Sequence, residues 1–167
     1  TTIPGLIDIT NNPRFVYDAY RRLIMMYSDV VLEKANNNFA NKSPGIRLQL
    51  EQDLNKIKKL YNYKYDSELT IEHLQELCKL FDKRIIKNFN LPFPNCAEKQ
   101  LWESIIAVLK SWNGKRALEY RKIENIPNDW GTAVNIQCMV FGNMGNDSAT
   151  GVAFTRNPST GENKLFG

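Results

Sequence analysis

The fold class of this chain depends on residues 131–142, which read Gly-Thr-Ala-Val-Asn-Ile-Gln-Cys-Met-Val-Phe-Gly. Apolar residues occupy every second position there, at Val134, Ile136, Cys138 and Val140. Because successive side chains of a strand point to opposite faces, this alternation predicts a β-strand. Residues 149–156 predict a second strand and residues 163–166 the start of a third, with turn-forming clusters between them. We therefore expect an antiparallel sheet fragment that starts near residue 130.

Upstream of this point the hydrophobic period is that of helices. From Pro13 onward two apolar stripes run side by side, which predicts a helix that is buried around most of its circumference. Asn12 is predicted to cap this helix. Further helices are predicted to end near Tyr63 and to start at Thr70 and at Asn95, and a last one spans residues 115–125. The expected fold class is α+β, mainly α, with about five helices before the predicted sheet.

Composition and charge exclude several classes of protein. The chain has 167 residues, 43% of them apolar and 24% charged, which excludes a disordered or collagen-like chain. No apolar run approaches the roughly 20 residues that cross a bilayer. The net charge is +4, but Lys and Glu are interleaved, so no nucleic-acid face is expected. One histidine, His73, and three scattered cysteines exclude a metal site built from His or Cys, and we expect reduced thiols in the cytoplasm.

Two groups of residues could bind phosphate, and each also has a simpler explanation. Glycines at 142, 145, 151 and 161 lie among Ser and Thr residues, a composition that suits phosphate loops but also ordinary hairpin turns. Arg21 and Arg22 interrupt a nearly apolar helix. They could pair with Asp18 or Asp29, or one of them could bind phosphate. No Walker A, G-x-G-x-x-G or G-x-S-x-G motif occurs.

Three long runs carry a resemblance to a known family. Residues 131–145, residues 150–162 and residues 12–22 closely resemble the pyruvate, phosphate dikinases, as do Ser111-Trp112 and Arg116-Ala117. The resemblance covers essentially the whole chain. It implies a parent enzyme that uses Mg²⁺ to convert ATP, phosphate and pyruvate to AMP, pyrophosphate and phosphoenolpyruvate. It also implies an N-terminal ATP-grasp domain, a central phosphohistidine domain, a pyruvate-binding barrel and a homodimer.

On this resemblance the chain divides into three segments. Residues 1–12 correspond to the remnant of a glycine loop, residues 13–127 to a helical subdomain, and residues 128–167 to a partial ATP-grasp sheet. The family has a longer stretch between Asp8 and Asn12. Because residue 1 is not Met and residue 167 follows a strand-like run, we expect an excised piece of a longer protein.

The resemblance assigns eight residues to nucleotide or phosphate binding. They are Gly5, Arg22, Gln137, Met139, Val140, Thr150, Gly151 and Ser159. The family's ATP-site Lys and Arg fall before this sequence and its Mg²⁺ ligands fall after it. We therefore expect no complete catalytic site and no metal ligands here, and an inactive chain when it stands alone.

Two other functions stay open. Phosphoenolpyruvate synthases share the ATP-grasp plan, although they resemble residues 154–162 less closely. A helical module that only binds a protein partner would also fit the charged helices. Such a module would not require Gly, Ser and Thr at the turns of residues 131–162.

Overall fold

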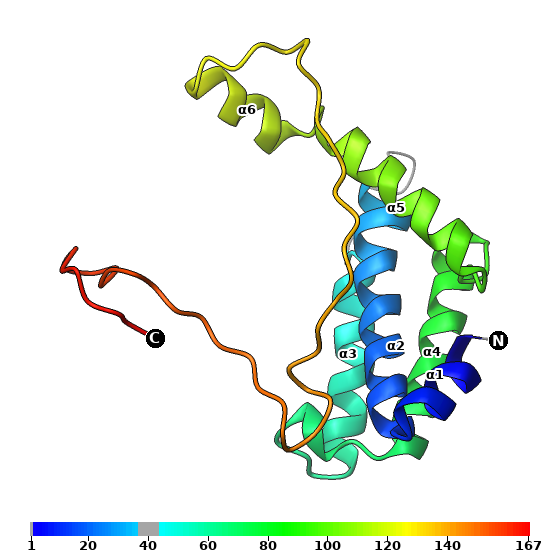
Figure 1. The fold of residues 1–167 in the computed structure, drawn as a ribbon. Helices are drawn as coiled ribbons and strands as arrows, with labels where there is room; N and C mark the ends of the chain where they lie inside the picture. Colours follow the sequence, from blue (N-terminus) through cyan, green and yellow to red (C-terminus); the bar gives the residue numbers. More distant parts are fainter. Residues whose placement is uncertain (1, 37–43) are drawn as a thin grey trace. The chain divides into compact units, whose positions relative to one another are not determined.

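The computed structural model describes residues 2–36 and 44–167. Thr1, from the predicted glycine-loop remnant, and residues 37–43, from the predicted helical subdomain, lie outside the described residues. The chain forms two compact units, a helical unit of residues 1–135 and a C-terminal unit of residues 136–167. Figure 1 shows that the described helices all belong to the helical unit. They are α1 (Thr2–Thr10), α2 (Pro13–Tyr27), the π-helix η1 (Ser28–Lys34), α3 (Ile46–Leu60), the 3-10 turn η2 (Asp66–Glu68), α4 (Ile71–Phe89), α5 (Ala97–Ser111) and α6 (Lys115–Ile123).

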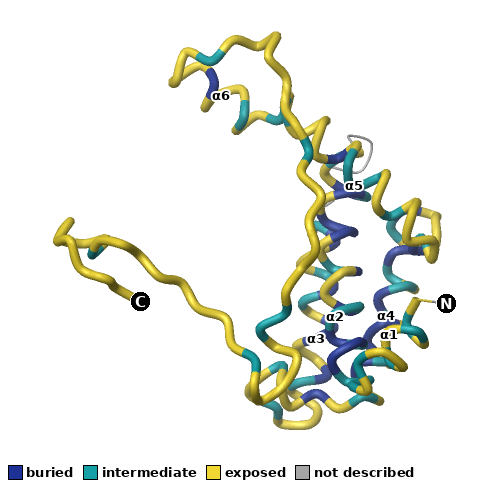
Figure 2. Tube along the Cα trace, in the orientation of Figure 1, coloured by how far each residue is buried: buried dark blue, intermediate teal, exposed yellow. Residues whose placement is uncertain are grey.

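The core of the helical unit lies where α2, α3 and α4 face one another. Figure 2 shows buried residues along the inner sides of these helices. The core is made of aliphatic and aromatic side chains, among them Ile24, Leu50, Leu74, Leu77, Phe81 and Ile85, each at most 1% exposed. Burying one such side chain contributes about 1.5–3 kcal/mol, so this contact holds the unit together.

Local signals set the ends of the helices. The side chain of Asn12 accepts a hydrogen bond from Phe15 N at 3.0 Å, and Thr70 caps α4 through His73 N at 3.4 Å. Both predicted caps are confirmed. The cap predicted at Asn95 is wrong, because α5 begins after Cys96, for which no capping bond to the described residues is found. The helix predicted over residues 115–125 is confirmed as α6.

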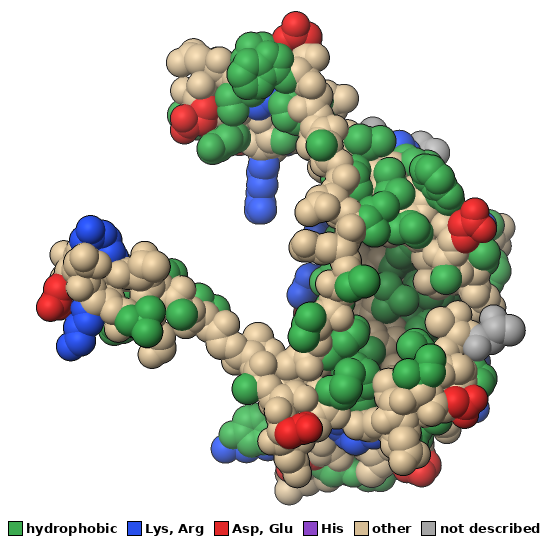
Figure 3. Space-filling model, viewed as in Figure 1, with side chains coloured by type: hydrophobic (Ala, Val, Ile, Leu, Met, Phe, Trp, Pro, Cys, Tyr) green, Lys and Arg blue, Asp and Glu red, His purple; other side chains and the backbone are tan. Residues whose placement is uncertain are grey.

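Helix α2 is buried on one side only. Ile24 and Tyr27 lie in the core, but Leu23 is 42% exposed and Met26 67% exposed. The prediction that both apolar stripes are buried is therefore wrong for these two residues. Figure 3 shows hydrophobic side chains gathered over α2 and α5 on the face in view. Of α5, only Ala107 is buried.

The predicted antiparallel sheet is not found, and the α+β fold class is wrong. Within the described residues the only β pairing is an isolated bridge, in which Phe154 N donates to Phe166 O at 2.8 Å and Phe166 N donates to Phe154 O at 3.0 Å. Val140 is 94% exposed and Ile136 64% exposed, so among the described residues no apolar layer covers the alternating face. Because an isolated strand pair is marginal without such a layer, the pattern alone does not produce a sheet. The chain is mainly helical, as expected.

No described helix combines the length with the apolar composition that crossing a membrane requires.

Candidate functional site

The eight predicted site residues fall in both units. Arg22 lies on α2 with its side chain 56% exposed, and Gly5 lies inside helix α1 rather than in a loop. The other six are exposed in the C-terminal unit, namely Gln137, Met139, Val140, Thr150, Gly151 and Ser159. In the described part of the chain no hydrogen bond joins any two of the eight. The assignment of residues 1–12 to a glycine loop stays a prediction, although residues 2–10 are helical.

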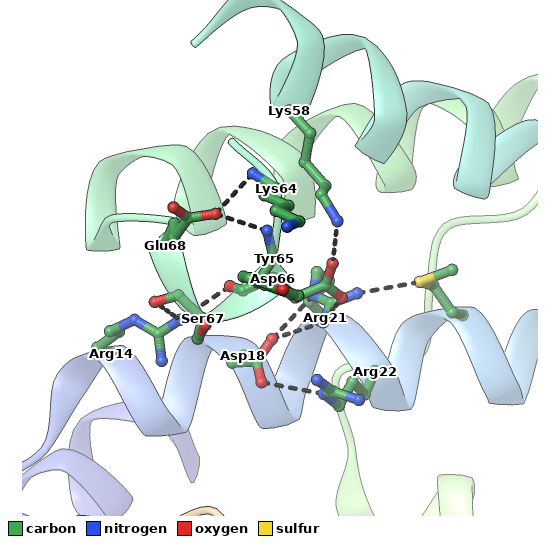
Figure 4. Close-up of polar contacts among 11 residues, drawn as sticks. Arg14, Asp18, Arg21, Arg22, Lys58, Lys64, Tyr65, Asp66, Ser67 and Glu68 are labelled. Carbon is green, nitrogen blue, oxygen red and sulfur yellow. Dashed lines mark hydrogen bonds and ion pairs between the residues drawn. The ribbon is translucent and has the colours of Figure 1, made fainter. Parts of the chain in front are cut away.

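Arg22 belongs to a group of charged side chains between α2 and η2 that Figure 4 shows in close-up. We call it the arginine cluster, and it comprises Arg14, Asp18, Arg21, Arg22, Lys58 and Asp66. Asp18 is its centre. Its Oδ1 accepts from Arg21 Nε at 3.0 Å and Arg21 Nη2 at 2.6 Å, and its Oδ2 accepts from Arg22 Nε at 3.0 Å.

The second carboxylate of the cluster, Asp66, ties η2 to the helices. It accepts from Arg21 Nη2 at 3.2 Å and from Lys58 Nζ at 2.8 Å. Burial acts to raise the pKa of Asp66, but the hydrogen bond from Lys58 and the nearby positive charges outweigh it and hold that pKa below its usual value. The carboxylate therefore stays ionised and keeps η2 in place.

The side chain of Arg14 holds the same turn in place by donating hydrogen bonds to backbone carbonyl oxygens. Its Nη2 donates to the carbonyl oxygens of Asp66 at 2.9 Å and Ser67 at 2.8 Å, and its Nε donates to that of Leu69 at 2.9 Å. Sequence reasoning missed Arg14, Lys58 and Asp66 as neighbours of Arg22. Arg14 and Asp18 are four residues apart on one helix face, a spacing that could have indicated the first of them.

The two explanations for the Arg21-Arg22 pair can now be compared. Both arginines bond Asp18, whereas Asp29 pairs with Lys34 at 2.9 Å. The ion pairing with Asp18 is confirmed. It uses Nε and Nη2 of Arg21, which is 2% exposed, but only Nε of Arg22. A phosphate role for Arg22 stays a prediction.

The C-terminal unit uses some of its predicted residues to build a turn. Asn157 Oδ1 accepts from Ser159 N at 2.9 Å and from Thr160 N at 3.3 Å. Gly161 has a φ of 75°, a conformation that favours glycine, and its N–H donates to Asn157 O at 2.8 Å. The glycine at 161 and the backbone N–H of Ser159 thus serve the turn.

Two other glycines of this unit differ in what surrounds them. A Cβ at Gly142 would overlap Thr150 Oγ1 and lie 2.6 Å from Ala149 O, so the backbone there requires glycine. A Cβ at Gly151 would meet no described atom within 4 Å, and its φ is not positive. The described chain therefore gives no steric reason for a glycine at 151.

The described residues do not fit a metal ion. No group of three or more His, Cys, Asp or Glu side chains among residues 2–36 and 44–167 could hold one. Both carboxylates of the arginine cluster are bonded by cationic side chains. The cysteines do not cluster either. Burial raises the pKa of the Cys78 thiol to about 12, whereas Cys96 and Cys138 are exposed.

Comparisons with known proteins identify the family. Residues 64–166 match the family "Pyruvate phosphate dikinase, AMP/ATP-binding domain". The chain is 44% identical over 166 residues to the pyruvate, phosphate dikinase of Clostridium symbiosum, covering 99% of this chain and 18% of that protein. It is 46% identical over 154 residues to the dikinase of Rhizobium meliloti, covering 92% of this chain and 16% of that protein. It is also 46% identical over 154 residues to the chloroplastic dikinase of Mesembryanthemum crystallinum, covering 92% of this chain and 15% of that protein. The chain spans less than a fifth of the length of these relatives. With a family match over more than half of its residues, it belongs to the pyruvate phosphate dikinase AMP/ATP-binding domain family.

Proposed function

We propose that this chain supplies part of the ATP- and phosphate-binding domain of a pyruvate, phosphate dikinase. The enzyme would convert ATP, phosphate and pyruvate to AMP, pyrophosphate and phosphoenolpyruvate through a phosphohistidine. The observation that carries the proposal is the 44% identity over 166 residues, which runs through both units. The three relatives named above are dikinases, which favours this function over a phosphoenolpyruvate synthase or a helical interaction module.

In this proposal the eight site residues bind the nucleotide and its phosphates. Gln137, Met139 and Val140 face the nucleotide, while Thr150 and Ser159 offer hydroxyl donors near the phosphates. Arg22 would bind phosphate oxygens, and Gly5 and Gly151 would let backbone N–H groups come close to them. Donors of this kind stabilise the charge that develops on transferred phosphoryl oxygens.

The remaining parts of the proposal concern the whole enzyme. Mg²⁺ would neutralise phosphate charge there, and no described residue is assigned to it because none forms a metal-binding group. The ATP-grasp plan, the central phosphohistidine domain and the homodimer belong to the same proposal. So does a cytoplasmic location, although the relative from Mesembryanthemum crystallinum is chloroplastic.

A chimera tests this function. The 167 residues replace the aligned 18% of the Clostridium symbiosum dikinase, and two half-reactions are measured separately. One is the ATP- and phosphate-dependent formation of the phosphoenzyme, and the other is phosphoryl exchange between phosphoenolpyruvate and pyruvate. We expect both to proceed. A chimera that exchanges phosphoenolpyruvate and pyruvate normally but cannot use ATP would contradict the proposal, because the exchange shows that the rest of the enzyme is folded.

A substitution at Gly151 in the same chimera tests the phosphate role of this residue. In the chimera, Gly151→Ile is expected to reduce the ATP half-reaction about a hundredfold, since a displacement of about 1 Å has that effect on an aligned transfer. The exchange half-reaction should be unchanged. Val152→Ile is the matched control, because Val152 is 69% exposed and the added methyl group lies one residue away. Equal loss in both half-reactions would show that Gly151 serves the fold, not the phosphates.

A further inference from the structure

The Arg22 side chain is attached at one nitrogen only. Its Nε donates to Asp18 Oδ2 at 3.0 Å, and its side chain is 56% exposed. Its two terminal nitrogens have no hydrogen-bond partner among residues 2–36 and 44–167. In Figure 4 the only dashed line to Arg22 comes from Asp18. The guanidinium is thus fixed at its inner edge and open at its outer edge.

Asp18, which fixes it, is itself held firmly. It is 5% exposed, and its other oxygen accepts both hydrogen bonds from Arg21. Arg21 is 2% exposed and also reaches Asp66, which Lys58 bonds in turn. An exposed ion pair at this helical spacing would hold a side chain only weakly. Here one partner is buried and locked by other bonds, so the position of Oδ2 is determined before any ligand arrives.

We propose that Asp18 is a positioning residue for phosphate binding by Arg22. By accepting from Nε it orients the guanidinium so that the two terminal nitrogens form a fork for the oxygens of a phosphate group. Arginine binds phosphate most strongly in this two-pronged way. Holding the side chain beforehand reduces the rotamer entropy that it would otherwise lose on binding. The inference rests on the proposed function, because it takes phosphate as the ligand of Arg22.

The charge of the cluster is compatible with an anion. Its six residues carry four positive side chains, Arg14, Arg21, Arg22 and Lys58, and only two carboxylates. Asp18 therefore orients Arg22 without cancelling the positive charge of the group. A phosphate at the outer edge of Arg22 would meet this remaining charge.

The test uses the isotope-labelled 167-residue chain and inorganic tripolyphosphate as the probe. Nuclear magnetic resonance follows the Arg22 Nε–H signal during titration. In the unmodified chain we expect that proton to exchange with water about tenfold more slowly than Nε–H of the exposed Arg116, because it is hydrogen-bonded. Tripolyphosphate should bind in the millimolar range, and Asp18→Asn should weaken it about tenfold, the equivalent of one lost orienting contact.

Asp29→Asn is the matched control. Asp29 is 4% exposed and pairs with Lys34 and Arg47, so the change removes a buried carboxylate without touching Arg22. We expect it to leave tripolyphosphate affinity unchanged. Asparagine at position 18 keeps an oxygen for Arg21, and far-ultraviolet circular dichroism checks that the helices remain.

Four results would overturn the inference. Unchanged affinity in Asp18→Asn would show that Asp18 does not position Arg22, and would leave the proposed function intact. Equal loss in Asp29→Asn would show a general effect of losing a buried carboxylate. If the unmodified chain binds tripolyphosphate without any change at Arg22, the phosphate role of Arg22 fails as well. Should Asp18→Asn not fold, fast exchange of Arg22 Nε–H in the unmodified chain would still contradict the proposal.

Discussion

Replacing Arg84 by Met is expected to lower the free energy of unfolding by about 3 kcal/mol near neutral pH. Asp53 of α3 is 2% exposed, and its carboxylate accepts two hydrogen bonds from Arg84 of α4, from Nε at 2.6 Å and from Nη2 at 2.9 Å. Methionine keeps an apolar stem but removes both donors, and so it leaves a buried carboxylate without its main opposing charge. The effect should fall at the low end of the range for buried pairs, because Arg84 is 29% exposed and Lys56 remains 3.5 Å away.

The loss of stability expected for Arg84→Met depends on pH. Burial acts to raise the pKa of Asp53, but the hydrogen bonds and charge of Arg84, with help from Lys56, outweigh it and hold the pKa below its usual value. A carboxyl group with a lowered pKa stabilises the fold above its unfolded pKa, and this contribution is lost as pH falls through the folded pKa. In Arg84→Met burial dominates and the pKa of Asp53 rises. Protonation of Asp53 then removes the unpaired buried charge of the variant. The stability that Arg84→Met loses relative to the unmodified chain should therefore shrink toward about pH 3.

Urea denaturation followed by circular dichroism measures the deficit at both pH values. Asp53→Asn and the double variant complete a thermodynamic cycle, in which we expect a coupling of about 1.5 kcal/mol or more near neutral pH. Lys79→Met is the control for losing an exposed cation from α4, and it should change stability by less than about 0.5 kcal/mol. The same deficit for Arg84→Met at neutral and acid pH would refute the reasoning, since the loss would then not come from an ionised Asp53.

Three further changes test the helical unit, each by urea denaturation. Ser28→Ala should leave stability unchanged or raise it by about 1 kcal/mol, because the buried hydroxyl has no partner among the described residues; a clear loss would reveal a bond. Asn12→Ala should cost about 1 kcal/mol by removing the cap on Phe15 N, and no change would show that the cap contributes nothing. Tyr27→Phe should cost about 2 kcal/mol by breaking the hydrogen bond to Glu103, and it should speed amide exchange in α5; unchanged exchange there would contradict an anchoring role.

The helices could be predicted because their signals are local. Asn12 before Pro13 and Thr70 before Ile71 each place a cap directly ahead of an apolar stripe, and both helices begin there. The π-helix η1 could not be predicted in this way, because residues Ser28–Lys34 continue the stripe of α2 without a break in composition. A widened turn is set by packing, which a linear pattern does not record.

The absence of the sheet and the composition of the arginine cluster could not be predicted, for a different reason. Alternation at residues 134–140 states which side chains share a face, but not whether a second strand or an apolar layer is present to cover it. The bond from Arg22 to Asp18 follows from helical spacing alone. The contacts of Asp66 and Lys58 join segments far apart in the sequence, and only the packing of α2, α3 and η2 brings them together.

Glycine shows most clearly what the structure adds to the composition. By sequence, Gly142, Gly151 and Gly161 are equivalent members of one glycine-rich segment, and turns explain them as well as phosphate loops do. The structure separates them. Gly142 lies against Thr150 and Gly161 has a positive φ, so both are required by the chain itself. Gly151 has open space and an ordinary φ. No described residue therefore obstructs a side chain at 151, and a phosphate group is the candidate that the proposed function supplies for a loss confined to the ATP half-reaction.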